Sequence, residues 1–389
     1  MSEISTEQSQ DIRLQIVESA EGISEFGEYW DDLFARAVDA PPFLSRPWVS
    51  TFIHEGRIKG TPLFMLAWYD SKLVALFPLA VRKYLNAKIA VPIGIGEVSY
   101  LGILRDPEYS SVVGCIAEKI ISERLFDVYL NIDLSSVDAS VNDFLTVFIQ
   151  KGYSYWRVRR TCCYLIQLGC SSDEYFSQHM SSRTRRTLNR EERRLLRDAD
   201  VRIQFYTGKE ITHEIVDRIA AVQEESWMKR RGVAVFGEQF HRKLMLEMAH
   251  AGNGCLWLMT INNDDAAFLY AFIAHRKLYL YWTAFKLRYK TLSIGKNLLM
   301  HAVCDACSND ISLIDFGPGD AEYKRFWATD YFDVSRAIAA SSLRGRLIAI
   351  CYCTIWRLAS VQYLHSFYRY VKYILRRFKQ KAAIICGHY

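Results

Sequence analysis

The sequence contains no apolar run long enough to cross a membrane. Its longest candidate, residues 347–356, is bounded by Arg346 and Arg357, and it falls short of the ~18 residues that a span requires. The opening residues, MSEISTEQSQD, are polar and acidic, unlike a secretory leader, which is basic and then apolar. We therefore expect a cytoplasmic protein with reduced thiols.

Disulfide and zinc-finger patterns are lacking as well. The ten cysteines are irregularly spaced. Cys304 and Cys307 have CxxC spacing, but they fall inside an expected helix and not at the strand–helix junction where redox-active pairs lie. No second pair stands at zinc-finger spacing. We interpret the cysteines, Cys162 and Cys163 included, as buried structural residues, and we predict no metal site.

The chain has enough length and apolar content for two domains. It has 389 residues, of which 50% are hydrophobic and 24% charged, with a modest net charge of +6, as in ordinary globular proteins. Hydrophobic periodicity and turn residues predict the same order of strands and helices twice. The fold expected is α+β, with similar domains at 1–170 and 171–342 and a helical tail at 343–389.

A loop before an expected helix is suited to bind phosphate. The segment KLRYKTLSIG (286–295) places Ser293 as a candidate N-cap and Gly295 in the first helical turn. Helix N-termini attract phosphate through unpaired N–H groups, and Arg288 and Lys290 add two cations upstream. The loop is consistent with a pyrophosphate-bearing cofactor, or alternatively with an ordinary capped helix that carries surface cations.

Ionisable residues gather in DFGPGDAEYKRFW (315–327), after the expected strand 311–316. We expect this strand beside strand 278–285, with the two splayed at their ends. Acyl transfer from a thioester requires a base for the acceptor's proton and a cation or N–H for the oxyanion. Asp315 or Asp320 is the candidate base, with Asp320 also a possible N-cap, and Lys324 the candidate cation; both Asp320 and Lys324 are expected to face the cleft. The alternative is a Gly-Pro turn with solvated charges.

These stretches resemble a known family. The pattern D-F-G-x-G-D-x-x-Y-K-x-x-W, preceded by the helix start L-S-x-G-x-x-L-L, is similar to the GNAT-fold acetyltransferases grouped with the CelD cellulose-biosynthesis proteins. These are distantly related to the FemAB aminoacyltransferases. PPFLSRPWVSTF (41–52) and SSRTRRTLNREERRL (181–195) agree with the resemblance, which spans about residues 43–338.

The resemblance implies tandem GNAT-like domains, with acyl-CoA, such as acetyl-CoA, bound by the second. It also implies a loop that binds the pyrophosphate of CoA and a group of residues on the side of the acyl acceptor. The loop comprises Ser293, Ile294, Gly295, Lys296 and Asn297, and the acceptor side comprises Asp315, Asp320, Tyr323 and Lys324. Relatives commonly have Ser-Pro-Gly where this chain has Ser-Ile-Gly, and the repeated glycines of ordinary GNAT loops are absent.

Arginines recur every three or four residues near position 190, which places them on one face of a helix. This stripe comprises Arg183, Arg186, Arg190, Arg193 and Arg197. It either binds a phosphorylated acceptor, a lipid-linked sugar or RNA, or it is balanced by Glu191, Glu192 and acids of the first domain. Arg183, Arg186 and Arg190 are the predicted substrate-binding residues. Because no aromatic residues interleave the arginines, single-stranded nucleic acid is disfavoured.

The tail combines aromatic and basic residues, and through 347–381 it either lies on an anionic membrane surface, such as the inner membrane face, or packs across the domains. The function expected is acyl transfer from CoA to an amine or hydroxyl of a carbohydrate or cell-envelope precursor. The alternatives are a non-catalytic scaffold of a polysaccharide-synthesis complex and a FemAB-type transferase that uses aminoacyl-tRNA.

Overall fold

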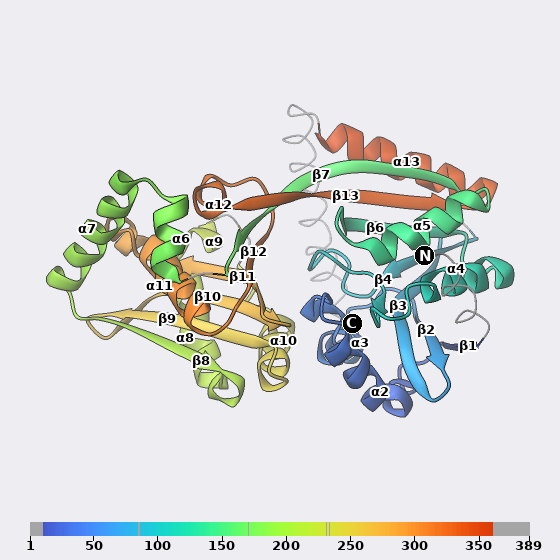
Figure 1. Ribbon diagram of the computed structural model, residues 1–389, viewed down its shortest axis with the longest axis horizontal. Helices are drawn as coiled ribbons and strands as arrows, with labels where there is room; N and C mark the ends of the chain where they lie inside the picture. Colours follow the sequence, from blue (N-terminus) through green and yellow to red (C-terminus); the bar gives the residue numbers. More distant parts are fainter. Residues whose placement is uncertain (1–10, 85, 170, 231, 233, 361–389) are drawn as a thin grey trace, which may run out of the picture.

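One mixed β-sheet runs through the whole molecule. The computed structural model describes residues 11–84, 86–169, 171–230, 232 and 234–360. In the sheet the strands stand in the order β1-β2-β3-β4-β6-β13-β7-β12-β11-β10-β9-β8, and β5 pairs with β3. The order is nearly symmetric about the neighbours β13 and β7, which cross between the two sides of the molecule in Figure 1.

The first half of the chain, up to residue 169, begins with β1 and ends with β7. Its elements in chain order are β1 (Ile12–Val17), α2 (Ile23–Arg36), η1 (Pro42–Leu44), α3 (Arg46–His54), β2 (Thr61–Tyr69), β3 (Lys72–Tyr84), β4 (Ala87–Pro92), β5 (Leu104–Arg105), α4 (Val112–Glu123), β6 (Val128–Ser135), α5 (Ala139–Gln150) and β7 (Ser154–Gln167).

The second half, residues 171–340, repeats this order after two leading helices. Its elements are α6 (Ser172–His179), α7 (Ser182–Asp198), β8 (Val201–Thr207), η2 (Gly208–Glu210), α8 (His213–Glu224), α9 (Trp227–Arg230), α10 (Gln239–His250), β9 (Gly254–Ile261), β10 (Asp264–Ala274), β11 (Lys277–Phe285), η3 (Leu287–Leu292), α11 (Ile294–Ser308), β12 (Leu313–Pro318), α12 (Glu322–Trp327) and β13 (Asp330–Ala340).

The final strands of the two halves are exchanged. β7, the last strand of the first half, pairs with β12 of the second, while β13 pairs with β6 of the first. β7 and β13 also pair with each other along their lengths, from Asp330↔Leu165 to Ala340↔Ser154. Each half therefore completes its part of the sheet with a strand from the other.

The predicted hairpins form where the turn residues indicated them. Asp70 lies between β2 and β3 with φ 52°, and Asn262 and Asn263 lie between β9 and β10 with φ 51° and 64°. Asn and Asp tolerate this left-handed conformation, which two-residue hairpins require. β4 was not expected from the sequence, because its residues other than Lys88 are buried and do not alternate.

Helices of the first half pack against the second half. Trp48, on α3, packs edge-on against Phe272 of β10, with 5.4 Å between the ring centroids. Phe43, in η1, meets Tyr279 of β11 at 5.7 Å. Phe52 of α3 contacts Phe240 of α10 at 4.9 Å. The stretch 41–52 thus packs between the two halves, and its aromatic rings belong to one hydrophobic core that includes residues of both halves.

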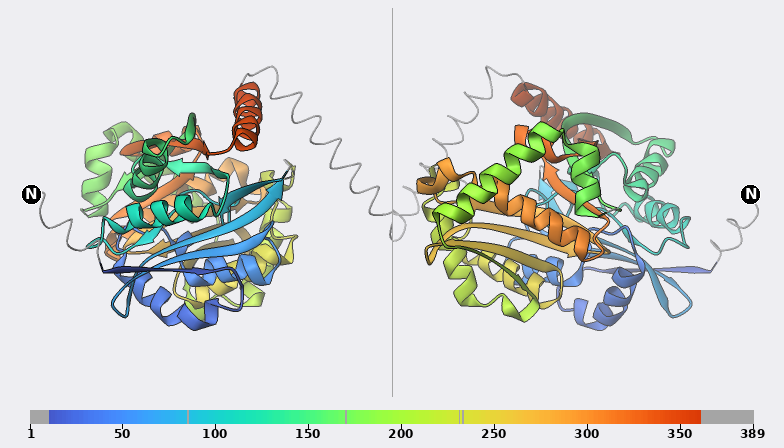
Figure 2. Two further views of the ribbon diagram at one scale, coloured as in Figure 1. Left: turned by 90° about the vertical axis from the view of Figure 1, so that its right-hand side faces the viewer. Right: turned by 60° about the vertical axis from the view of Figure 1, so that its left-hand side comes forward.

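The tail begins with α13 (Leu343–Ser360), which lies along β13 and β7 at the edge of the molecule (Figures 1 and 2). Gly345 allows α13 to come close to the start of β6, because a Cβ there would come within 3.0 Å of Val128 and 3.1 Å of the Asp127 carbonyl oxygen. The rest of the predicted tail helix, 361–389, lies outside the described residues. Among the helices of the described ranges, none combines the length and apolar content that a membrane span needs.

Candidate active site

Strands β11 and β12 separate in the second half, as expected. They pair in parallel at only three positions, the last being Tyr279↔Asp315. Beyond this pair, β11 continues to Phe285, whereas β12 turns away at Gly317, where φ is 67°. Within the described residues no strand pairs with this edge of β11 past Tyr279, so its N–H and C=O groups are open to a ligand.

Asp315 lies at the point of separation and is 3% exposed. Its Oδ1 atom accepts three hydrogen bonds: from the Gly317 amide at 2.6 Å, the Cys163 thiol at 3.0 Å and the Tyr100 hydroxyl at 3.2 Å. Burial raises the pKa of Asp315 above its usual range, although these hydrogen bonds act in the opposite direction. The carboxyl group is therefore a stronger base than an exposed aspartate.

Tyr100 and Cys163 come from the first half of the chain, and no pattern in the sequence indicated either as a site residue. Cys163 reaches Asp315 because it lies on the exchanged strand β7, opposite Pro318 of β12. Its thiol and the Tyr100 hydroxyl are 2.5 Å apart. Burial and the nearby Asp315 raise the pKa of both groups, so both stay protonated and act as donors. Cys163 is therefore buried, as expected, but it contacts a candidate catalytic group.

Lys324 does not face a cleft, contrary to expectation. It is 8% exposed, and its Nζ donates to the carbonyl oxygens of Gly317 at 2.9 Å and Pro318 at 3.0 Å. Burial lowers its pKa, while the nearby Cys163 and Asp315 act to raise it. The Gly-Pro turn folds back over the ammonium group, so Lys324 holds the end of β12 in place.

Asp320 also differs from expectation. It lies on the surface, where it accepts a hydrogen bond from Tyr164 at 2.9 Å and pairs with Arg325 at 2.9 Å. The N-cap of α12 is Ala321, so the predicted capping by Asp320 is wrong. Tyr323 is exposed and contacts the ring of Phe316 edge-on. The catalytic roles assigned to these residues remain predictions, but only Asp315 among the four lines the cavity between the halves.

A cavity of about 560 Å³ lies between the two halves, next to Asp315. Its volume is within the usual range of small-molecule sites, roughly 300–1,000 Å³. Tyr100, Tyr279 and Phe332 supply aromatic walls. Its charged lining is mixed and comprises Asp39, Arg105, Asp138, Lys277, Asp315 and Asp330.

Several of these charged groups are already paired. Lys277 pairs with Asp39 at 2.7 Å, Arg105 donates to Ser140 at 3.0 Å, and Asp138 caps α5 by accepting from the Val141 amide at 3.2 Å. Among the described residues, the hydrogen bonds to Asp315 all end on Oδ1, which leaves Oδ2 for a ligand's proton.

The predicted phosphate loop lies at the start of α11. Gly295 stands in the first turn, as expected, and Ser293 is at the N-cap position with φ 53°. The Ser293 side chain makes no capping bond. Asn297 is buried and donates to the Ser293 carbonyl at 3.2 Å. Lys296 is exposed and pairs at 3.8 Å with Glu191.

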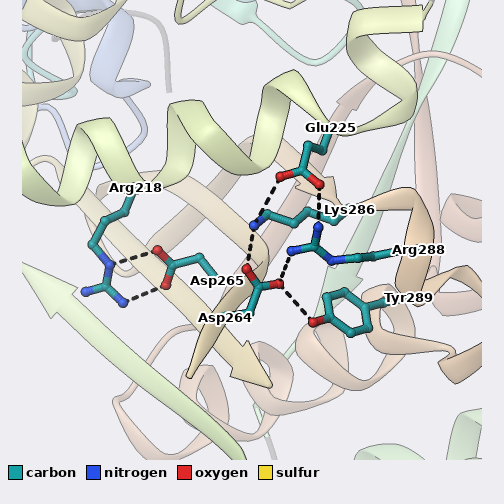
Figure 3. A network of polar contacts seen from close by, with 7 residues as sticks. All are labelled: Arg218, Glu225, Asp264, Asp265, Lys286, Arg288 and Tyr289. Atoms are coloured by element: carbon teal, nitrogen blue, oxygen red, sulfur yellow. Dashed lines mark hydrogen bonds and ion pairs between the residues drawn. The ribbon is translucent and has the colours of Figure 1, made fainter. Parts of the chain in front are cut away.

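Arg288 is held in a network of charges and is not free to bind phosphate (Figure 3). Its guanidinium donates to Glu225 at 2.7 Å and to Asp264 at 2.5 Å. Lys286 donates to Asp264 at 2.8 Å, and the Tyr289 hydroxyl does so at 2.9 Å. Burial opposes ionisation of Asp264, but its three donors prevail and lower its pKa to about 2. Lys290, the other predicted cation, is exposed.

The stripe of arginines runs along the exposed face of α7, as the spacing predicts. In the described part of the chain, Arg183, Arg186 and Arg190 form no ion pair; Arg194 and Arg197 pair with Asp198 on the same helix. Glu191 and Glu192 pair with Lys296 and His301 of α11 instead. Among the described residues, no acidic side chain of the first domain forms an ion pair with these arginines, so that alternative is wrong there.

α7 and α11 lie side by side on one face of the second half (Figure 2). A cavity of about 270 Å³ lies where they meet, and it is lined by Arg190, Glu191, Arg194 and Leu195 of α7 and by Thr291, Leu292 and Ser293. Arg190 thus stands next to the predicted phosphate loop. Arg194, which was not among the predicted site residues, joins it there.

Comparison with known proteins agrees with the GNAT-like part of the resemblance. Residues 182–325 match the model of an acetyltransferase (GNAT) domain. None of the curated proteins matches the chain. Among solved structures, FemX is similar with a TM-score of 0.58 and 11% identity, over 80% of this chain and 95% of that one.

Two further solved structures are similar over most of their lengths. The C-terminal domain of a lysylphosphatidylglycerol synthetase from Agrobacterium fabrum has a TM-score of 0.54 and 11% identity, over 85% of this chain and 96% of that one. L-PGS from Bacillus licheniformis has a TM-score of 0.52 and 10% identity, over 88% and 98%. At such identities the likeness concerns the fold, which is α+β with two tandem GNAT-like domains, as expected. The narrower resemblance to the CelD-like proteins stays a prediction.

Proposed function

We propose that this chain is an acyltransferase that moves an acyl group from CoA to an amine or hydroxyl of a carbohydrate or cell-envelope precursor. The observation that carries the proposal is the position of Asp315. It is a buried carboxyl at the point where β11 and β12 separate, and it borders a cavity of about 560 Å³ between the halves. The matching GNAT domain covers these strands.

In the proposed reaction the acceptor's nitrogen or oxygen attacks the thioester carbonyl carbon and loses its proton to Asp315. The pKa of this carboxyl is raised by burial, which suits it to a general base. Tyr100 and Cys163 hold the carboxyl through Oδ1, so Oδ2 can receive the proton. The open edge of β11 offers N–H groups that can stabilise the developing oxyanion. The C–S bond then breaks, and the CoA thiolate takes the proton held by Asp315 and leaves as the thiol, which returns Asp315 to the carboxylate.

CoA would supply the activated acyl group, and the residues near the start of α11 suit its phosphates. Arg190 and Arg194 line a cavity with Thr291, Leu292 and Ser293, and the first N–H groups of a helix lack intrahelical partners. These residues would hold the phosphates. Arg288 is given no such role, because its guanidinium is engaged by Glu225 and Asp264.

A second donor, aminoacyl-tRNA, is favoured by one observation. The arginines of α7 continue along the helix beyond the predicted phosphate loop, in a surface hollow lined by Arg186, Asn189, Arg190, Arg193, Arg194 and Arg197. This row is longer than a CoA pyrophosphate needs. If aminoacyl-tRNA is the donor, acetyl-CoA will not bind, while tRNA will bind with an affinity that falls steeply as salt is raised.

Acyl transfer can be measured as CoA thiol released from acetyl-CoA, with glucosamine as an amine acceptor and N-acetylglucosamine as a hydroxyl acceptor. Asp315→Asn should lower turnover by ~10²–10⁴ because the base is lost. Asp217→Asn is the matched control, since Asp217 lies on the surface in an ion pair with Arg242, and it should retain near-normal turnover. Equal turnover by wild type and Asp315→Asn would contradict the proposal.

A further inference from the structure

Helix α13 has two apolar faces, of which the described protein covers one. Ile348, Ala349, Cys353 and Trp356 are each at most 7% exposed. These residues belong to the hydrophobic core that both halves share, and the helix packs on β13 and β7. Tyr352 adds a hydrogen bond from Arg82 at 3.0 Å. One side of α13 is therefore firmly docked on the sheet.

The opposite side of α13 exposes large apolar residues. Leu343 is 79% exposed, Leu347 65%, and Ile350 and Ile355 50% each. Leu343, Leu347 and Ile350 are spaced by four and three residues, which places them along one side of the helix, whereas Ile355 lies at the margin of that side. A helix that borders only water normally carries polar residues on that side. A continuous exposed apolar face of this kind is typical of a surface that binds something.

The charge around this face has one sign. Arg344 and Arg357 are exposed at its two ends. Residues 334–389 contain ten Lys and Arg and no Asp or Glu. Because the whole chain has a net charge of +6, the residues before 334 carry a net charge of −4. Positive charge is therefore concentrated in the last part of the chain, around the exposed apolar face.

Only one kind of occupant suits both the apolar residues and the charge. A second copy of α13, or the basic segment 361–389 of the same chain, would bring cations against Arg344 and Arg357. A nucleic-acid backbone would satisfy the arginines but would give leucine and isoleucine nothing apolar to contact. An anionic lipid surface provides phosphate for the arginines and an apolar layer directly beneath it.

We propose that α13 docks the protein on an anionic membrane surface, with Leu343, Leu347 and Ile350 in the headgroup layer and Arg344 and Arg357 against lipid phosphates. The helix lies flat on the surface and its other side stays packed on the sheet. Because β13 leads directly from the cavity residues Asp330–Phe332 to α13, docking also fixes how the cavity stands relative to the membrane. This surface does not depend on the proposed acyl transfer.

The test is co-sedimentation of the full chain with phosphatidylglycerol-rich vesicles and with pure phosphatidylcholine vesicles. Wild type should sediment with the anionic vesicles, and the double variant Leu347→Glu/Ile350→Glu should bind them at least roughly tenfold more weakly. The matched control is Val38→Glu/Ile149→Glu, which changes two apolar residues that are 55% and 46% exposed elsewhere. This control should bind as wild type does.

Hydrogen exchange and light scattering distinguish docking on a membrane from coverage of the α13 face by a second copy of the chain. The amides of residues 343–357 should exchange more slowly when anionic vesicles are added. Equal binding by wild type and the α13 double variant, or equal binding to both kinds of vesicle, would overturn the proposal. So would a wild-type dimer that the double variant converts to a monomer without vesicles, because a second copy would then cover the face.

Discussion

The carboxyl group of Asp315 lies among hydrogen-bond donors from both halves of the chain. The sequence indicated a carboxylate at the end of this strand and could place Asp315, Asp320 and Lys324 near one another. It could not show which of them borders a cavity, because that depends on a turn in which Gly317 and Pro318 direct their carbonyl groups at Lys324. Tyr100 and Cys163 could not be predicted either, since their relation to Asp315 is purely tertiary.

The pH dependence of stability provides a test at this residue. The folded-state pKa of Asp315 is raised, so the unfolded chain loses this proton at a lower pH than the folded chain does. The contribution of Asp315 to stability is thus complete below the ordinary aspartate pKa and is lost as the pH rises from there through the raised folded value. Asp315→Asn keeps an oxygen for all three hydrogen bonds and has no charge to bury.

We therefore expect the melting temperature of Asp315→Asn to rise relative to that of wild type as the pH is raised from acidic to neutral. Thermal unfolding of both proteins across this range measures the difference. A difference that does not change with pH would show that the carboxyl group has an ordinary pKa.

Lys324 is expected to act on stability through the turn. Lys324→Met removes both hydrogen bonds to the Gly317 and Pro318 carbonyls and should cost about 1–3 kcal/mol. Arg325→Met, which removes an exposed ion pair with Asp320, should cost about 1 kcal/mol at most. Denaturant unfolding gives both values. If Lys324→Met is as stable as Arg325→Met, the lysine does not hold the turn.

At the scale of elements, hydrophobic periodicity and turn residues predicted most strands and helices. They did so where one face is buried, as in α7, or where Asp and Asn occupy a hairpin turn. They failed for β4, whose residues other than Lys88 are buried without alternation. The predicted phosphate loop lies at the start of α11, as expected. The engagement of Arg288 could not be predicted, because its partners Glu225 and Asp264 come from α8's C-terminal end and β10.

This network should fix η3, which leads into the phosphate loop. Asp264→Asn removes the charge that faces Lys286 and Arg288, and it should lower stability by about 2 kcal/mol at neutral pH. The pKa of Asp264 is lowered to about 2, so its contribution is present above the unfolded aspartate pKa and is lost as the pH falls toward 2. Unfolding of wild type and Asp264→Asn should therefore converge at acidic pH; a constant gap would contradict this.

At the scale of the whole molecule, the exchange of β7 and β13 unites the two halves. The repeated order of expected strands and helices predicted two similar domains, and this order is present in the structure. Local sequence patterns cannot reveal an exchange of strands between the halves. β7 and β13 have the pattern of ordinary strands, and this pattern is the same whichever strand each one pairs with. The boundary at residues 170 and 171 stays a prediction, since the strand on each side of it pairs across the halves.

Separated halves should therefore not fold independently. Residues 1–170 alone would lack β13 beside β6, and residues 171–342 alone would lack β7 beside β12, which leaves unpaired strand edges. We expect each fragment to be insoluble or to unfold without a cooperative transition, and the two to recover a single transition when expressed together. A sharp thermal transition from either fragment by itself would show that the exchange is dispensable.

The measurement that tests the central claim most directly is a calorimetric titration of the full chain with acetyl-CoA. Wild type should bind, and Gly295→Asp, which places a carboxylate next to the phosphates, should bind more than tenfold more weakly, or by over ~1.4 kcal/mol. Gly114→Asp, at a glycine with open space on α4, should bind as wild type does. No heat of binding from wild type at millimolar acetyl-CoA would contradict a CoA-dependent acyltransferase and would favour the scaffold or the tRNA-dependent alternative.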